Sequence, residues 1–181
     1  MTRFIAALAI AVAVFASAPS HAAGSDDATK YIEGIAKQAL STISNPKNNK
    51  VQKQAALDKL FKNSVDIPWV GRFVLGQFWR KATDDQHARY LREYEKFLIT
   101  HYTSRFADYT SGTFTMTGTK DDGEDEFTVS MELKGDKKND PPVLVDYRVR
   151  RSGGNFKIFD VIVEGVSLIT TQRSEFAAVV N

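Results

Sequence analysis

The chain has 181 residues, with 24 lysines and arginines, 22 aspartates and glutamates and no cysteine. The lack of cysteine excludes disulfide bonds, cysteine-ligated zinc or iron–sulfur centres and a thiol nucleophile. A net charge of +2 excludes a protein whose main role is to bind nucleic acid, because contacts with a phosphate backbone need many cations.

The first 22 residues are predicted to be a secretory signal peptide. Arg3 gives a positive start, and residues 4–15 form an uncharged apolar run. That run is shorter than the roughly 20 residues of a membrane-spanning helix. Small residues at Ser20 and Ala22 predict cleavage after Ala22. We therefore expect residues 23–181 to form a single exported domain.

Apolar residues at helical spacing predict three helices in the part of the chain that follows. Asp26 or Asp27 can cap the first helix, whose apolar positions recur every three or four residues. A second, less regular helix is predicted over residues 50–61. Asp66 can cap a third helix, which we expect to continue to Trp79.

A fourth and longer helix is predicted from Asp84 to about Tyr109. Thr83 and Gln86 precede and open it, and this spacing is typical of a capping box, in which the two side chains satisfy backbone amides at a helix start.

From Thr113 onward the apolar residues alternate instead, which predicts strands. Strands are expected over residues 127–133, 143–150 and 156–163, followed by a helical stretch over 168–179. These patterns predict an α+β fold in which helices wrap a curved antiparallel β-sheet. Such an arrangement commonly encloses an apolar pocket.

The sequence contains none of the usual catalytic or metal-binding patterns. His87 and His101 lie on one predicted helix, about 21 Å apart at about 1.5 Å per residue, so they cannot share a metal ion. No G-x-S-x-G, P-loop or G-x-G-x-x-G motif is present. The acidic residues 121–126 lack the ligand pattern of a calcium loop, and we interpret them, like residues 134–140, as hairpin tips. We therefore predict no catalytic residues and no metal site.

Asp160 is the one carboxylate that invites a catalytic interpretation. Alternation places it on the same strand face as Phe156, Ile158 and Ile162, and a carboxyl in apolar surroundings can act as an acid or base. A small cavity enzyme, an isomerase, dehydratase or hydrolase using Asp160 or Tyr147, is the competing function. The favoured interpretation is structural: Asp160 bonds to a helix end or pairs with an arginine.

Four cations lie around the turn at residues 152–155: Arg148, Arg150, Arg151 and Lys157. They could contact an anionic lipid head group or an acidic membrane surface, or they could simply solvate the outer face of the sheet. The sequence leaves both interpretations open.

Several segments together resemble the toluene-tolerance (MlaC) family. The most specific are residues 74–80 (VLGQFWR), 145–149 (VDYRV) and 159–168 (FDVIVEGVSL), and the resemblance extends over roughly residues 28–180. It implies a soluble periplasmic carrier that binds phospholipid acyl chains in an apolar pocket, with no enzymatic activity and no cofactor apart from the cargo. A hopanoid-associated branch of this family makes a polycyclic lipid the alternative cargo.

The resemblance also implies partners and a set of residues for the pocket. The expected partners are an inner-membrane ABC transporter with an MCE-domain subunit and an outer-membrane lipoprotein–porin complex. Ordinary core packing is the alternative for each residue of the pocket, and we expect it to hold for about half of them. The residues expected to line the pocket are Leu75, Phe78, Trp79, Phe97, Tyr102, Phe106, Val129, Met131, Val145, Tyr147, Val149, Val166 and Leu168.

Overall fold

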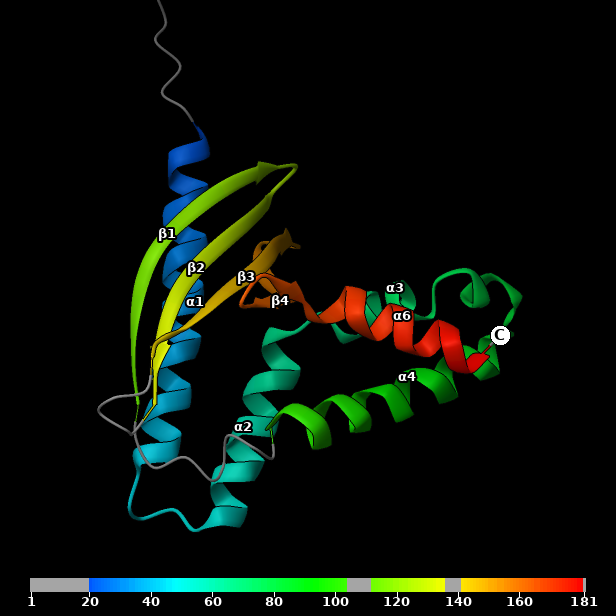
Figure 1. Cartoon of the computed structure of the whole chain (residues 1–181), viewed down its shortest axis with the longest axis horizontal. Coiled ribbons are helices and arrows are strands. Elements are labelled where there is room, and N and C mark those ends of the chain that lie inside the picture. Colours follow the sequence, from blue (N-terminus) through cyan, green and yellow to red (C-terminus); the bar gives the residue numbers. More distant parts are fainter. Residues whose placement is uncertain (1–19, 104–111, 136–140, 181) are drawn as a thin grey trace, which may run out of the picture.

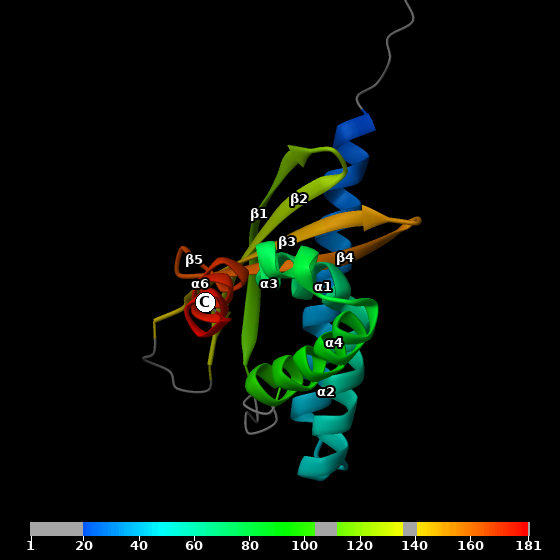
Figure 2. The same cartoon turned by 90° about the vertical axis from the view of Figure 1, so that its right-hand side faces the viewer.

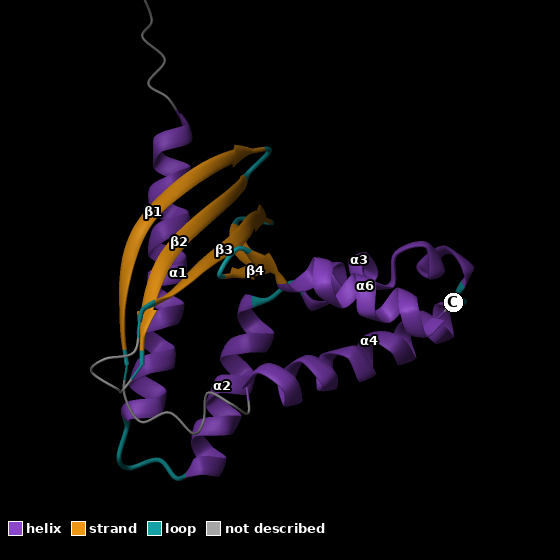
Figure 3. Ribbon diagram, in the orientation of Figure 1, coloured by secondary structure: helices purple, strands orange, loops and turns teal. Residues whose placement is uncertain are grey.

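The computed structural model describes residues 20–103, 112–135 and 141–180. Helices come first, an antiparallel sheet follows, and a last helix ends the described chain (Figures 1 and 3). The α+β class with a curved antiparallel sheet is confirmed. No helix among the described residues has both the length and the apolar character needed to cross a membrane.

The first two helices are α1, Ser20–Ser44, and α2, Lys50–Ser64. The expected caps of the first helix, Asp26 and Asp27, were wrong, because α1 begins six residues earlier and both aspartates lie inside it. The alanines that precede them favour helix strongly. Helix α2 begins where the periodicity predicted, behind a capping box of Asn49 and Gln52 that sequence reasoning missed.

Helix α3 spans Ile67–Leu75, and the short 3-10 helix η1 follows at Gly76–Lys81. The cap by Asp66 is confirmed, since its carboxylate accepts a 3.2 Å hydrogen bond from the amide of Trp69. The expected continuation as one helix to Trp79 was wrong. Gly76 has φ +58° and ends the α-helix, a conformation that glycine adopts without steric cost.

Helix α4 spans Asp84–Leu98, and a π-helical turn, η2, continues it over Ile99–Thr103. The predicted capping box is confirmed: the Gln86 amide donates to Thr83 Oγ1 over 3.3 Å, and the Thr83 amide donates to Gln86 Oε1 over 2.8 Å. The predicted extension to Tyr109 lies outside the described residues.

The sheet contains β1 (Thr113–Gly123), β2 (Glu126–Lys134), β3 (Val143–Ser152), β4 (Asn155–Val163) and β5 (Val166–Ser167), in that spatial order. Each strand pairs antiparallel with the next. Helix α6, Leu168–Val180, leaves β5 directly. The acidic residues 121–126 form the β1–β2 hairpin tip as predicted, whereas residues 136–140 of the other predicted tip are outside the described chain.

Helix α1 covers one face of the sheet and forms the first hydrophobic core with it (Figure 2). Ala28 and Ile32 of α1 are 0% and 1% exposed. They pack against inward side chains of β2, β3 and β4. This core closes the α1 side of the sheet.

A β-bulge in β4 changes which residues share a face. Arg148 pairs with Asp160, but the next residue, Val149, pairs with Ile158, so Phe159 is an extra residue in the ladder. Alternation is therefore inverted beyond the bulge. The prediction that Asp160 shares a face with Phe156 and Ile158 was wrong for this reason.

The second hydrophobic core lies in a helical arm, built by α3, α4 and α6, that projects from the sheet (Figure 1). Val70 and Val74 of α3, Tyr94 of α4 and Ile169 of α6 are buried in it. The bulge residue Phe159, 3% exposed, belongs to this core rather than to the first one. The bulge thus joins the sheet to the helical arm.

Candidate functional site

Aromatic rings from α4 and α6 form a continuous array in the helical arm. Tyr90 stacks on Tyr94 with centroids 5.5 Å apart, and Tyr94 lies 6.2 Å from Phe97. Phe176 of α6 meets these rings edge-on at 5.8 to 6.5 Å, a favoured geometry for aromatic pairs. Phe97, a predicted pocket residue, lies at the solvent edge of the array and is 38% exposed.

A buried polar network fixes α6 against the neighbouring helices. Gln172 is 4% exposed; its carbonyl oxygen accepts a hydrogen bond from the Tyr94 hydroxyl, and its Nε2 donates to the Tyr102 hydroxyl over 2.7 Å. Burial raises the pKa of Tyr94 above its usual range, so this hydroxyl stays a donor. Tyr102, another predicted pocket residue, is therefore a structural partner of α6.

A depression of about 740 Å³ lies on the helical arm where η1, α4 and the end of α6 meet. Leu75, Phe78 and Tyr90 give it an apolar floor, and Lys81 and Arg89 supply cations. The ammonium of Lys81 lies 5.5 Å from the ring centroid of Phe78, close enough for a cation–π contact. This volume falls within the range of small-molecule sites, roughly 300 to 1,000 Å³.

Trp79 lies on a second depression of about 400 Å³, between α3, η1 and α6. Its indole stacks on His87 at 3.8 Å with an interplanar angle of 8°, and His87 Nε2 lies 2.8 Å from the Trp79 carbonyl oxygen. His101 stacks on Phe97 at 5.4 Å. Both histidines thus pack against aromatic rings. The described residues hold no group of three potential metal ligands.

The predicted pocket residues of the sheet lie under α1. All of them except Tyr147 are at most 4% exposed and belong to the first core. Tyr147 faces the same core and is half-buried, and burial raises its pKa to about 12. The four fully buried members are Val129, Met131, Val145 and Val149.

The remaining predicted pocket residues lie elsewhere. Val166 of β5 is 57% exposed, and Leu168 is half-buried at the start of α6. Phe106 is outside the described residues. The predicted set is therefore divided between the sheet core, the helical arm and the junction between them. Leu75 and Phe78 line the first depression together, and Trp79 lines the second.

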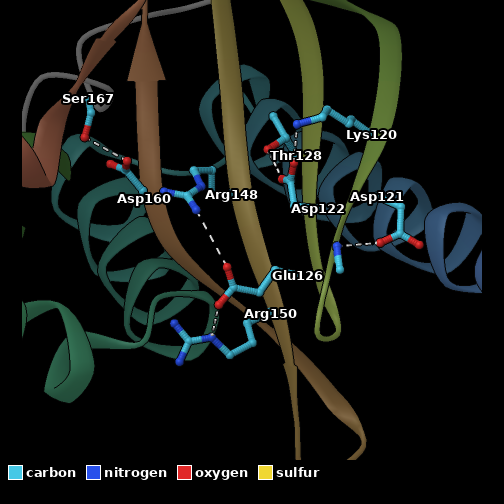
Figure 4. A network of polar contacts seen from close by, with 10 residues as sticks. Lys120, Asp121, Asp122, Glu126, Thr128, Arg148, Arg150, Asp160 and Ser167 are labelled. Carbon is cyan, nitrogen blue, oxygen red and sulfur yellow. Dashed lines mark hydrogen bonds and ion pairs between the residues drawn. The ribbon is translucent and has the colours of Figure 1, made fainter.

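Asp160 holds the first residues of α6 against the sheet. Its side chain is buried, and it accepts a hydrogen bond from Ser167 Oγ at 2.8 Å (Figure 4). It accepts a second from the Ile169 amide at 3.3 Å. The expected bond to a helix end is confirmed. Tyr147 faces the opposite side of the sheet, so Asp160 and Tyr147 do not form a common acid–base site.

Arg148 and Arg150 connect the outer face of the sheet with α3. Both pair with Glu126, at 3.6 and 3.0 Å (Figure 4). Both guanidinium carbons lie 4.7 Å from the ring centroid of Phe159. Arg150 also lies 4.5 Å from the ring centroid of Trp69. These arginines are therefore partly neutralised and pack on aromatic rings, which favours a structural role over a free cationic patch.

The other two cations at this end of the sheet also have partners. Nη2 of Arg151 lies 3.4 Å from Oδ2 of Asp27 in α1, and Nε of Arg151 lies 3.8 Å from Oδ1 of Asp125. Lys157 donates to the carbonyl oxygen of Asn63 in α2.

Replacing Asp160 with asparagine is expected to lower the free energy of unfolding by about 1–3 kcal/mol. The carboxylate now accepts from the Ser167 hydroxyl and the Ile169 amide. In the variant, a side-chain NH₂ group replaces one of the accepting oxygens and cannot accept from these donors. Equilibrium urea unfolding measures this change. Glu175→Gln on the exposed side of α6 is the control and should stay within about 0.5 kcal/mol of the parent. Equal stability of the two variants would contradict the anchoring role.

Comparison with known proteins relates this geometry to one family. The family model for MlaC protein matches residues 33–181. The chain is also similar to the toluene tolerance protein ttg2D of Pseudomonas putida, with 26% identity over 123 residues. That match covers 67% of this chain and 56% of the relative, so it spans little more than half the relative's length.

A solved structure has the same fold. It is a phospholipid-binding protein from Ralstonia solanacearum in complex with a phospholipid, with a TM-score of 0.73 and 24% sequence identity. The superposition covers 85% of this chain and 87% of that chain. The likeness therefore extends over most of both chains.

Proposed function

Because the chain belongs to the MlaC family, we propose that it is a soluble periplasmic carrier that binds phospholipid acyl chains and moves lipid between the outer and inner membranes without chemical change. Residues 1–22 are the export signal in this proposal, and residues 23–181 are the lipid-binding domain. Its partners are an inner-membrane ABC transporter with an MCE-domain subunit and an outer-membrane lipoprotein–porin complex.

The observation that carries this proposal is the amphipathic depression on the helical arm. Its floor of Leu75, Phe78 and Tyr90 suits an acyl chain. A solved structure of the same fold contains a bound phospholipid, which supports phospholipid as the class of cargo.

Energetics indicate how such a carrier must work. Two acyl chains contain on the order of 30 methylenes, and exposing them to water costs roughly 24 kcal/mol at about 0.8 kcal/mol each. This exceeds the practical limit of non-covalent affinity, about 18–21 kcal/mol. The carrier therefore competes with bilayers and partner cavities rather than with water, and lipid transfer is a near-balanced exchange that needs no catalytic group.

Within the predicted set, we propose that the residues of the helical arm and junction other than Tyr102 contact lipid, whereas Tyr102 and the sheet residues stabilise the fold. Contact with Val129 or Met131 would require α1 to leave the sheet, because both lie in the closed first core. Contact with Leu75 or Phe78 requires only that a lipid enter an open depression.

Organic extraction of the protein purified from its native envelope, followed by mass spectrometry, tests the proposed function. We expect co-purified phospholipid, and uptake of labelled phospholipid from vesicles by the delipidated protein. Recovery of a polycyclic hopanoid instead would identify the alternative cargo. A protein that is repeatedly free of lipid and takes up none from vesicles would contradict the proposal.

Placing a carboxylate in the first depression should weaken lipid uptake specifically. Phe78→Glu is expected to reduce vesicle-derived phospholipid about tenfold, because it removes a ring from the apolar floor and puts a carboxylate, which is costly to desolvate, where the acyl chain would lie. Val51→Glu, at a position of α2 that is 77% exposed, adds the same charge and should take up lipid like the parent. Equal uptake by both variants would place the acyl chains elsewhere.

A further inference from the structure

The second depression, between α3, η1 and α6, is rich in arginine. Three guanidinium groups line it, those of Arg72, Arg80 and Arg173, and none of its described lining residues is acidic. All three side chains are exposed. Within the described part of the chain none of them forms an ion pair, in contrast to Arg148 and Arg150, which share Glu126.

Arg173 is held in position by α3. Its Nη1 donates to the Phe73 carbonyl oxygen over 3.2 Å, and its guanidinium carbon lies 4.8 Å from the Phe73 ring centroid. A Cβ added to Gly76 would lie 3.2 Å from Nη2 of Arg173, so the guanidinium rests against a backbone that glycine leaves open. A guanidinium has five N–H donors, and this arrangement uses one of them.

The walls beside these cations are flat aromatic surfaces. Trp69, Phe73 and Trp79 line the same depression as the three arginines. Trp69 stacks on Phe73 at 5.4 Å, and His87 stacks on Trp79, so the rings are fixed in place. A ligand that fits this surface combines an anion with an apolar or neutral portion.

We propose that the depression formed by Arg72, Arg80, Arg173 and their aromatic neighbours binds the phosphate group of a phospholipid. Guanidinium groups recognise phosphate by paired hydrogen bonds in a planar fork, and a phosphate balances cations that have no acidic partner here. The inference rests on the proposed function, because it takes the phosphate to be that of the lipid cargo.

Isothermal titration calorimetry on the delipidated full domain tests the proposal with three probes. These are dihexanoyl phosphatidylglycerol below its micelle concentration, dihexanoylglycerol with the same chains and no phosphate, and inorganic phosphate. We expect the parent protein to prefer the phospholipid to the diacylglycerol. The triple variant Arg72→Gln, Arg80→Gln, Arg173→Gln should lose about ten- to a hundredfold in phospholipid affinity and keep its diacylglycerol affinity.

Two further triple variants separate a phosphate site from general attraction. Replacing Lys47, Lys59 and Arg92 with glutamine removes the same charge from exposed positions outside the depression and should leave phospholipid affinity unchanged. Replacing the three arginines of the depression with lysine keeps the charge but loses the planar fork, and it should weaken phospholipid binding by several-fold.

Each contrary outcome has a distinct meaning. Equal phospholipid affinity of the parent and the arginine-to-glutamine variant would overturn the site. Inorganic phosphate binding as tightly as the phospholipid would overturn the lipid as the source of the phosphate. Failure of the parent to bind either dihexanoyl lipid would contradict the proposed function itself and the inference with it.

Discussion

Replacing Met131 with alanine is expected to lower the free energy of unfolding by about 2–5 kcal/mol, the largest effect that we anticipate for a single side chain. Met131 is 1% exposed. It pairs with Met116 of β1 and Val145 of β3, on the face covered by α1. Its truncation removes apolar burial and leaves a cavity that the sheet can fill only in part. Urea unfolding followed by circular dichroism measures the loss.

The matched control for Met131 is Val51→Ala on α2. Val51 is 77% exposed, so its truncation should change the free energy of unfolding by no more than about 0.5 kcal/mol. We also expect folded Met131→Ala protein to take up phospholipid like the parent, because Met131 is proposed to stabilise the fold and not to contact lipid. Unchanged stability combined with reduced lipid uptake would place Met131 in the pocket.

Replacing Gly71 with alanine should lower the free energy of unfolding by about 1–3 kcal/mol. A Cβ at Gly71 would lie 2.8 Å from Leu91 Cδ2 and 3.1 Å from Tyr94 Cδ1, so the end of the Leu91 side chain must turn away and the buried Tyr94 ring must shift. This overpacking outweighs the intrinsic advantage of alanine in a helix, about 0.5–1 kcal/mol. Tyr90, whose hydroxyl donates to the Gly71 carbonyl oxygen over 3.0 Å, would be displaced as well.

Gly34→Ala in α1 is the control, because it makes the same substitution without the steric conflict. No side chain beyond its chain neighbours and no other element lies within 4 Å of a Cβ added at Gly34, so alanine should raise the free energy of unfolding by about 0.4–1 kcal/mol. The two variants are thus expected to change stability in opposite directions in urea unfolding. If the Gly71→Ala protein is as stable as the Gly34→Ala protein, the α3–α4 interface accommodates the added methyl group without loss of stability, and the prediction is wrong.

These predictions assign different roles to the two hydrophobic cores. The first core, between α1 and the sheet, is closed and consists of inward side chains at strand spacing. The second core, in the helical arm, borders both depressions and contains most of the aromatic array. Phe159 and the Asp160 anchor of α6 join the two. Movement of lipid through the arm would therefore leave the first core intact.

Local patterns in the sequence were sufficient to predict most of the elements. Helical spacing and caps predicted α2, α3 and α4, because Asp66, Thr83 and Gln86 act on amides within three residues of themselves. Alternation predicted β2, β3 and β4 for the same local reason. Strand β1 was not predicted as a separate strand, because its outward residues and the register shift after Met116 weaken its alternation.

The placement of the candidate site depended on longer-range packing. Periodicity identified Val129 and Met131 as facing inward, but it could not tell whether α1 or a lipid covers them. The bulge at Phe159 inverted the face of Asp160, and a bulge depends on pairing with another strand rather than on spacing within one.

The sequence by itself determined the α+β class, the order of the elements and the family, because caps, periodicity and motifs are all read within short segments. Tertiary structure alone decided that Arg72, Arg80 and Arg173, up to 101 residues apart in the sequence, share one depression. That juxtaposition arises from the packing of α6 on α3, and no spacing along the chain records it.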